Sequence, residues 1–116
     1  RALNIFRTFN GTAPKQVVLL TDLHGENVLS ATREPWLAID PKPFVGDPAY
    51  DVVQHMLNCL DRMKDNPNAL AERMAGLTGV EGNRVKAWLF ARCVQEGLSG
   101  QEWAEPLKAI APRIRF

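Results

Sequence analysis

The stretch from Val17 to Asp51 reads VVLLTDLHGENVLSATREPWLAIDPKPFVGDPAYD, and it decides which fold the chain can adopt. Short apolar runs alternate in it with polar loops and a Pro-containing turn, which is typical of short strands joined as a hairpin. The loop after the first run holds Asp22 and Asn27, and a later apolar run ends on Asp40. The pattern therefore predicts a hairpin that brings Asp22, Asn27 and Asp40 together.

These three side chains have the spacing of a phosphoryl-transfer site. Asn27 follows Asp22 by five positions, and Asp40 comes thirteen positions after that. Protein kinases use one Asp to accept the hydroxyl proton, and an Asn and a second Asp to hold Mg²⁺. Mg²⁺ takes oxygen ligands, and the transfer mainly requires positioning and charge neutralisation. The spacing therefore favours chemistry of the kinase type.

The same segment resembles the catalytic loop of the aminoglycoside phosphotransferases, and within them the streptomycin 6-kinase and hydroxyurea phosphotransferase branch. The runs that carry the resemblance are Asp22-Leu23-His24, Asn27-Val28-Leu29, Arg33-Glu34-Pro35-Trp36-Leu37-Ala38-Ile39-Asp40-Pro41-Lys42 and Val45-Gly46-Asp47-Pro48-Ala49-Tyr50-Asp51. The family usually has His-Gly before the catalytic Asp, whereas this chain has Leu20-Thr21. It often has a small residue before the Asn, where this chain has Glu26.

The resemblance implies an ATP-dependent phosphotransferase that phosphorylates a hydroxyl of a small-molecule antibiotic, of the aminoglycoside or hydroxyurea type, and so confers resistance by inactivation. It implies Asp22 as the catalytic base and Asn27 and Asp40 as the ligands of Mg²⁺, with ATP as co-substrate. The fold it implies is α+β: a mostly helical C-terminal lobe of a protein-kinase-like fold, with a small β-hairpin that carries the catalytic loop.

We expect residues 1–116 to form a single domain that is part of this C-terminal lobe. The chain begins with Arg1 instead of Met, and neither a lysine-bearing strand nor a glycine-rich phosphate loop precedes Asp22. We therefore expect the N-terminal ATP-binding lobe of the same protein to be missing from this chain, and the isolated fragment to be inactive.

Charge and composition exclude several other classes. The 14 Lys and Arg residues nearly balance the 13 Asp and Glu residues, and no basic run with aromatic residues suggests a nucleic-acid partner. No apolar stretch is long enough to form a transmembrane helix, so no membrane partner is expected, and no signal peptide is visible. Cys59 and Cys93 lie in apolar helical patterns, which predicts reduced core cysteines and a cytoplasmic protein.

Start and stop signals predict helices in the rest of the chain. They are expected at residues 2–9, 48–62, 67–78, 81–96 and 99–112, with inward faces formed by Leu3, Ile5, Phe6, Phe9, Val52, Val53, Met56, Leu57, Leu60, Met63, Leu70, Met74, Leu77, Val85, Leu89, Cys93, Leu107 and Ile110. Gly97 is expected to stop the helix before it, and Trp36, Trp88 and Trp103 are expected in the core.

Several polar residues keep more than one interpretation. His24 could touch substrate or brace the loop. Lys42 could meet phosphate or face solvent. Asp51 could accept hydrogen bonds from the backbone of the catalytic loop, or only compensate the helix dipole. Asp47 is predicted to be an N-cap.

Two other functions compete with the kinase hypothesis. Asp22-Leu23-His24-Gly25, Gly46-Asp47 and Gly82-Asn83 follow the order of metallophosphoesterase motifs. However, Arg84 stands where that pattern needs a His, and the chain has only two histidines for a site that needs several. The second alternative is a non-catalytic helical remnant or interaction module of kinase-like fold, because the lobe that would hold ATP is missing.

Overall fold

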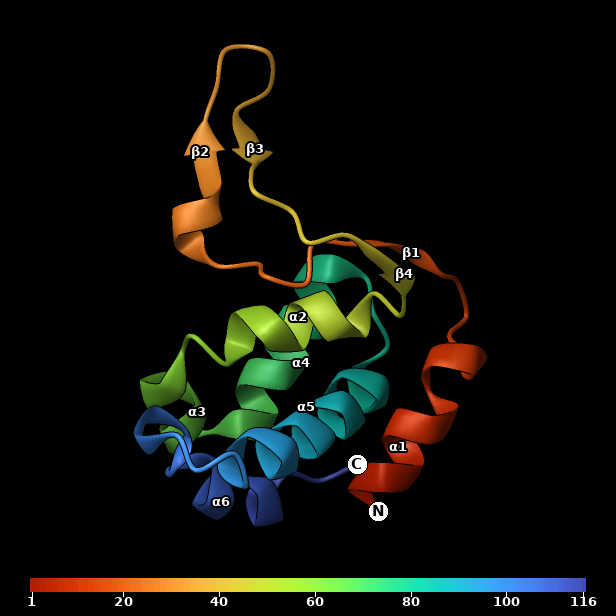
Figure 1. Ribbon diagram of the computed structural model, residues 1–116, viewed down its shortest axis with the longest axis vertical. Coiled ribbons are helices and arrows are strands. Elements are labelled where there is room, and N and C mark those ends of the chain that lie inside the picture. Colours follow the sequence, from red (N-terminus) through yellow and green to blue (C-terminus); the bar gives the residue numbers. More distant parts are fainter.

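In the computed structural model, which describes residues 1–116, helices build most of an α+β fold and two pairs of short antiparallel strands lie at one end (Figure 1). The α-helices are α1 (Ala2–Thr8), α2 (Ala49–Met56), α3 (Leu60–Asp65), α4 (Pro67–Thr78), α5 (Gly82–Gly97) and α6 (Leu107–Ile110). The strands are β1 (Val17–Leu19), β2 (Val28–Ser30), β3 (Trp36–Ala38) and β4 (Phe44–Gly46). Short 3₁₀ helices are η1 (Asn10–Thr12), η2 (Gly25–Asn27), η3 (Glu102–Ala104) and η4 (Ala111–Arg113).

Helix α5 is the centre of the hydrophobic core and packs against α1, α2, α4 and α6. Its predicted inward residues Val85, Trp88, Leu89 and Cys93 are all buried, because their spacing of three and four places them on one stripe of the helix. The Trp88 ring is met edge-on by three aromatic rings at centroid distances of 5.7–6.1 Å. Those rings belong to Phe6, Phe9 and Tyr50.

Local capping signals place α4 and α5 where they were expected. Asn66 directly precedes Pro67, and its side chain accepts a hydrogen bond from the Ala69 amide. The Glu81 carboxylate accepts hydrogen bonds from two backbone amides in the first turn of α5. Gly79 ends α4 with a φ of 71°, a left-handed conformation that glycine adopts without a steric penalty. These predictions are confirmed.

The predicted helix over 48–62 is wrong as one element, because the chain breaks between α2 and α3. The Cys59 amide bonds the Met56 carbonyl three residues back, so the last turn of α2 tightens and ends. Asn58 is a weak helix former, and its side chain donates to the Gln54 carbonyl at 3.2 Å, which favours leaving the helix. The break still leaves Met63 fully buried.

Other predicted faces are also corrected. Leu77 is 71% exposed, and α4 instead buries Ala71 and Ala75, whose small side chains let α5 approach closely. Gly97 does not stop α5 but is its last residue, and it is buried where an added Cβ would lie 3.3 Å from the Lys108 amide nitrogen. Leu3 on α1 is exposed as well.

The continuous C-terminal helix is wrong too. Residues 102–113 form η3, α6 and η4 in succession, since Pro106 and Pro112 each lack the N–H that a helix interior needs. Leu107 and Ile110 are buried as predicted, whereas Trp103 is 49% exposed.

The strand pairing differs from the single predicted hairpin. Strand β1 pairs with β4, with Val18 opposite Val45, and only β2 and β3 form a hairpin, with Leu29 opposite Leu37. This hairpin projects from the helical body (Figure 1), so Trp36 at its end is 67% exposed instead of buried. A two-stranded hairpin has no second layer above it that could cover such a side chain.

A buried ion pair joins the end of β4 to α5. The Asp47 carboxylate, 1% exposed, accepts hydrogen bonds at 2.6 Å from Arg84 Nε and from Trp88 Nε1, and one from the Ala49 amide at the start of α2. Arg84 also donates to the Phe9 carbonyl. Asp47 is therefore more than the predicted N-cap, since it ties the start of α2 to the core.

None of the helices has both the length and the hydropathy needed to cross a membrane. Both cysteines are free thiols, with Cys93 buried and Cys59 partly buried, as predicted.

Candidate catalytic loop and metal ligands

The loop between β1 and η2 is hydrogen-bonded to Asp51 on the first turn of α2. One carboxylate oxygen accepts the Leu20 amide at 2.7 Å, and the other accepts the Thr21 amide at 2.9 Å. A carboxylate accepts such backbone donors more strongly than a neutral group does. Asp51 therefore acts on the loop backbone in addition to lying near the positive end of a helix.

Thr21 is the strained position of this loop. Its φ is 59°, in the left-handed region that a β-branched residue rarely adopts. The Thr21 hydroxyl donates to the Lys42 carbonyl at 2.5 Å, and the Lys42 amide donates to the Leu20 carbonyl at 3.0 Å. These bonds and the Asp51 carboxylate hold Thr21 in place, and they join the loop to the segment after β3.

Asn27 is hydrogen-bonded to Asp22 and to the residue before Asp40. Its side-chain amide donates to the Asp22 carbonyl at 3.0 Å, and its own carbonyl accepts the Ile39 amide at 2.8 Å. The first bond crosses the loop, and the second crosses the hairpin to the residue before Asp40. The structure therefore links Asn27 to the Asp22 backbone and to Ile39, the residue before Asp40.

The oxygens of the predicted metal ligands are not used within the protein. The Asn27 amide donates through its nitrogen, and neither its side-chain oxygen nor the Asp40 carboxylate accepts a hydrogen bond from another residue. Asp40 has a φ of 52°, which Asp tolerates better than most residues. Two free oxygen donors fit Mg²⁺, which commonly binds through one or two protein oxygens together with phosphates and water. No cluster of three or more His, Cys, Asp or Glu side chains offers an all-protein metal cage.

The Asp22 carboxylate lies near two basic side chains. Its carboxylate lies 2.6 Å from the Lys42 ammonium nitrogen and 3.9 Å from His24 Nε2, which is too far for a hydrogen bond. The hydrogen bond from Lys42 holds the pKa of Asp22 below its usual value, and the charge on His24 adds to this. The same pair raises the pKa of Lys42, to which the charge on Asp40 also contributes. Lys42 therefore pairs with Asp22 although most of its side chain is exposed.

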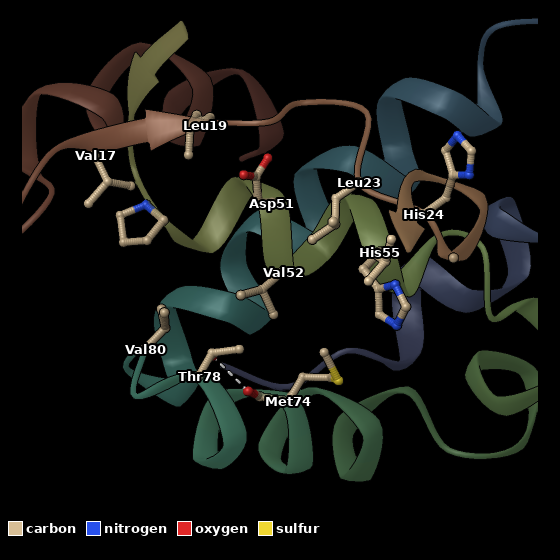
Figure 2. A pocket seen from close by; sticks show the side chains of 13 residues that line it. Val17, Leu19, Leu23, His24, Asp51, Val52, His55, Met74, Thr78 and Val80 are labelled. Atoms are coloured by element: carbon tan, nitrogen blue, oxygen red, sulfur yellow. Dashed lines mark hydrogen bonds between the residues drawn. The ribbon is translucent and has the colours of Figure 1, made fainter. Parts of the chain in front are cut away.

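A cavity of about 410 Å³ lies between the loop, β1, α2 and α4. Leu23, Val52 and Met74 point into it from the loop, from α2 and from α4 (Figure 2). His24 and His55 also line it, but Asp22, Asn27 and Asp40 do not. It is thus an apolar space behind the loop and separate from the three predicted site residues.

Sequence reasoning did not identify two interactions around the site. The ion pair of Lys42 with Asp22 and the hydrogen bond from the Thr21 hydroxyl to the Lys42 carbonyl each join residues about twenty positions apart. No short sequence motif predicts contacts over that distance. One signal was present, because Thr21 stands where the resembling family has Gly, the residue best suited to a positive φ.

Comparisons with known proteins identify relatives of the chain. The family model described as aminoglycoside/hydroxyurea antibiotic resistance kinase matches residues 1–105. The chain is 41% identical over 105 residues to a streptomycin 6-kinase of Streptomyces griseus, which covers 85% of this chain and 34% of that protein. It is 38% identical over 85 residues to a hydroxyurea phosphotransferase of Kitasatospora aureofaciens, which covers 73% of this chain and 24% of that protein.

The matched region is a minor part of both relatives, since the chain spans about a third of the first and about a quarter of the second. No solved structure matches the chain significantly.

Proposed function

Because the chain belongs to the aminoglycoside/hydroxyurea antibiotic resistance kinase family, we propose that it carries the catalytic loop and metal ligands of an ATP-dependent phosphotransferase. The acceptor is a hydroxyl of a small-molecule antibiotic of the aminoglycoside or hydroxyurea type, and phosphorylation inactivates it. The named activities of two relatives support this acceptor class, since one is a streptomycin 6-kinase and the other a hydroxyurea phosphotransferase.

In this proposal residues 1–116 form part of the C-terminal lobe of a protein-kinase-like fold. The N-terminal ATP-binding lobe belongs to a part of the same protein outside these residues, and the isolated chain is inactive. The matched region makes up only 34% and 24% of the two relatives, which supports this assignment. Because the reaction consumes ATP, we assign the protein to the cytoplasm.

The single observation that carries the proposal is the hydrogen-bonding of Asn27. It bonds the Asp22 carbonyl with its amide nitrogen and keeps its amide oxygen free, while its backbone carbonyl accepts the amide of Ile39, the residue before Asp40. Asn27 and Asp40 would hold Mg²⁺, and the ion would supply positive charge to neutralise the phosphates of ATP. Asp22 orients the acceptor hydroxyl and takes its proton as the new oxygen–phosphorus bond forms.

Substitution of the two carboxylates tests the proposal in the protein expressed from the complete open reading frame that encodes this chain. Asp22→Asn should lower kcat by roughly 10²- to 10⁴-fold and leave Mg²⁺·ATP affinity nearly unchanged. Asp40→Asn should remove activity together with Mg²⁺-dependent nucleotide binding. Asp61→Asn, on the exposed surface of α3, is the matched control.

The assay is transfer of labelled phosphate from ATP to streptomycin and to hydroxyurea. If Asp22→Asn retains the kcat of Asp61→Asn, Asp22 is not the base and the proposed mechanism fails.

A further inference from the structure

Lys42 is the only Lys or Arg whose side chain pairs with a proposed catalytic carboxylate. Its ammonium nitrogen lies 2.6 Å from an Asp22 carboxylate oxygen. No basic side chain forms an ion pair with Asp40, and the other basic group near Asp22 is His24 at 3.9 Å. Lys42 is therefore the Lys or Arg side chain best placed to meet a phosphoryl group at Asp22.

The base of the Lys42 side chain is held firmly. The Lys42 amide donates to the Leu20 carbonyl at 3.0 Å, and the Lys42 carbonyl accepts the Thr21 hydroxyl at 2.5 Å. Pro41 and Pro43 flank the residue and restrict the backbone on both sides. The four-carbon side chain therefore starts from a defined point beside the catalytic loop.

The tip of the same side chain is in contact with solvent. The Lys42 side chain is 61% exposed and that of Asp22 34% exposed, and ion pairs in contact with water contribute little to stability. The pair is consequently easy to exchange for a stronger partner. A magnesium-bound triphosphate carries more negative charge than one carboxylate, so it competes well for the ammonium group.

From this geometry we propose that Lys42 is a further catalytic residue, whose ammonium group pairs with Asp22 in the absence of nucleotide and contacts the transferred phosphoryl group when ATP is bound. The inference rests on the proposed phosphotransferase function and extends it. The exchange also frees the Asp22 carboxylate to meet the acceptor hydroxyl, so binding of ATP prepares the base.

Lys42 keeps its proton throughout the reaction. The acceptor oxygen forms a bond to the γ-phosphorus, the bond between that phosphorus and the bridging oxygen breaks, and ADP leaves. The hydroxyl proton passes to Asp22. The ammonium group stabilises negative charge on the phosphoryl oxygens during transfer, a contribution that fixed cations make in other phosphoryl-transfer enzymes.

Three variants of the protein expressed from the complete open reading frame test this role. Lys42→Met removes the charge and keeps much of the length, Lys42→Arg keeps the charge, and Lys64→Met is the control on the exposed surface of α3. Two rates are measured with Mg²⁺·ATP: phosphate transfer to streptomycin, and hydrolysis of ATP without an acceptor. Lys42→Met should lower kcat by roughly 10²-fold and change KM for ATP by much less, and Lys42→Arg should recover part of kcat.

The split between kcat and KM separates this role from a merely structural one, which would lower the melting temperature and leave kcat below that temperature unchanged. If Lys42→Met has the kcat of Lys64→Met while Asp22→Asn is inactive, the inference on Lys42 fails and the proposed function stands. If Asp22→Asn is also fully active, or if the unsubstituted protein neither transfers nor hydrolyses phosphate, the proposed function fails and this inference fails with it.

Discussion

Replacing Asp51 with Asn should loosen the catalytic loop by a measurable amount. The carboxylate accepts two backbone amides, those of Leu20 and Thr21. The Asn side chain has one acceptor oxygen, so one amide loses its partner and faces the NH₂ group, while the other bond becomes neutral. A hydrogen bond to a charged group contributes about 1.5–3 kcal/mol and a neutral one about 1 kcal/mol. Because the site is only partly buried, we expect a total loss of about 2–3 kcal/mol in the free energy of unfolding.

The assay is urea unfolding followed by circular dichroism on the 116-residue chain. With a slope of about 1–3 kcal/mol per M, the midpoint should fall by about 0.7–3 M. Amide hydrogen exchange at Leu20 and Thr21 should accelerate by roughly 30- to 150-fold, which corresponds to the same free energy.

Asp61→Asn is the matched control, since Asp61 lies in the first turn of α3 as Asp51 lies in the first turn of α2. Both substitutions remove the same kind of interaction with the helix dipole, worth about 0.3–1 kcal/mol. Only Asp51→Asn removes the two loop hydrogen bonds. Equal midpoints for the two variants would refute the reasoning that Asp51 holds the loop.

Three further measurements test other contacts. The pKa of the Asp22 carboxyl should lie below 3.8 when titrated by NMR, and it should move back toward that value in Lys42→Met, because the variant lacks the hydrogen bond that lowers it. The lowered pKa also means that the pair stabilises the fold above pH 3.8 and that this stabilisation is lost as the pH falls through the folded pKa. An unchanged Asp22 pKa in the variant would show that the pair does not form. Thr21→Gly should be more stable to urea than Thr21→Ala by about 1 kcal/mol, since only Gly adopts the positive φ without penalty; equal stability would argue against a left-handed residue at this position. Burial raises the pKa of the Cys93 thiol to about 12, so a thiol reagent at pH 8 should modify Cys59 in the folded chain and Cys93 only after unfolding, and equal rates would contradict the buried position.

Local signals in the sequence account for the parts of the fold that are correctly predicted. Asn66, Glu81 and Gly79 act on amides or carbonyls within four residues of themselves, so helix ends could be read without knowing any neighbour. The buried face of α5 around Trp88 could also be predicted from the sequence, because an α-helix repeats every 3.6 residues. The motif of Asp22, Asn27 and Asp40 also lies within one short segment of the chain.

The exposure of side chains and the pairing of strands could not be predicted from local sequence signals. Trp36 has an apolar pattern suited to a core, but it is exposed because the β2–β3 hairpin projects beyond the helices. The partner of β1 is β4, more than twenty residues later, and several pairings of short apolar runs satisfied the same pattern. Which pairing forms depends on the packing of the whole chain.

The sequence alone predicted the chemistry proposed for the candidate site, since the types and spacing of Asp22, Asn27 and Asp40 lie within one segment. Only the tertiary structure decided how that chemistry is held. Lys42 reaches Asp22 from twenty positions away, and Asp51 reaches the loop amides from about thirty. The physical reason is range: capping and periodicity act over one helical turn, whereas these contacts exist only after segments distant in the sequence have come together.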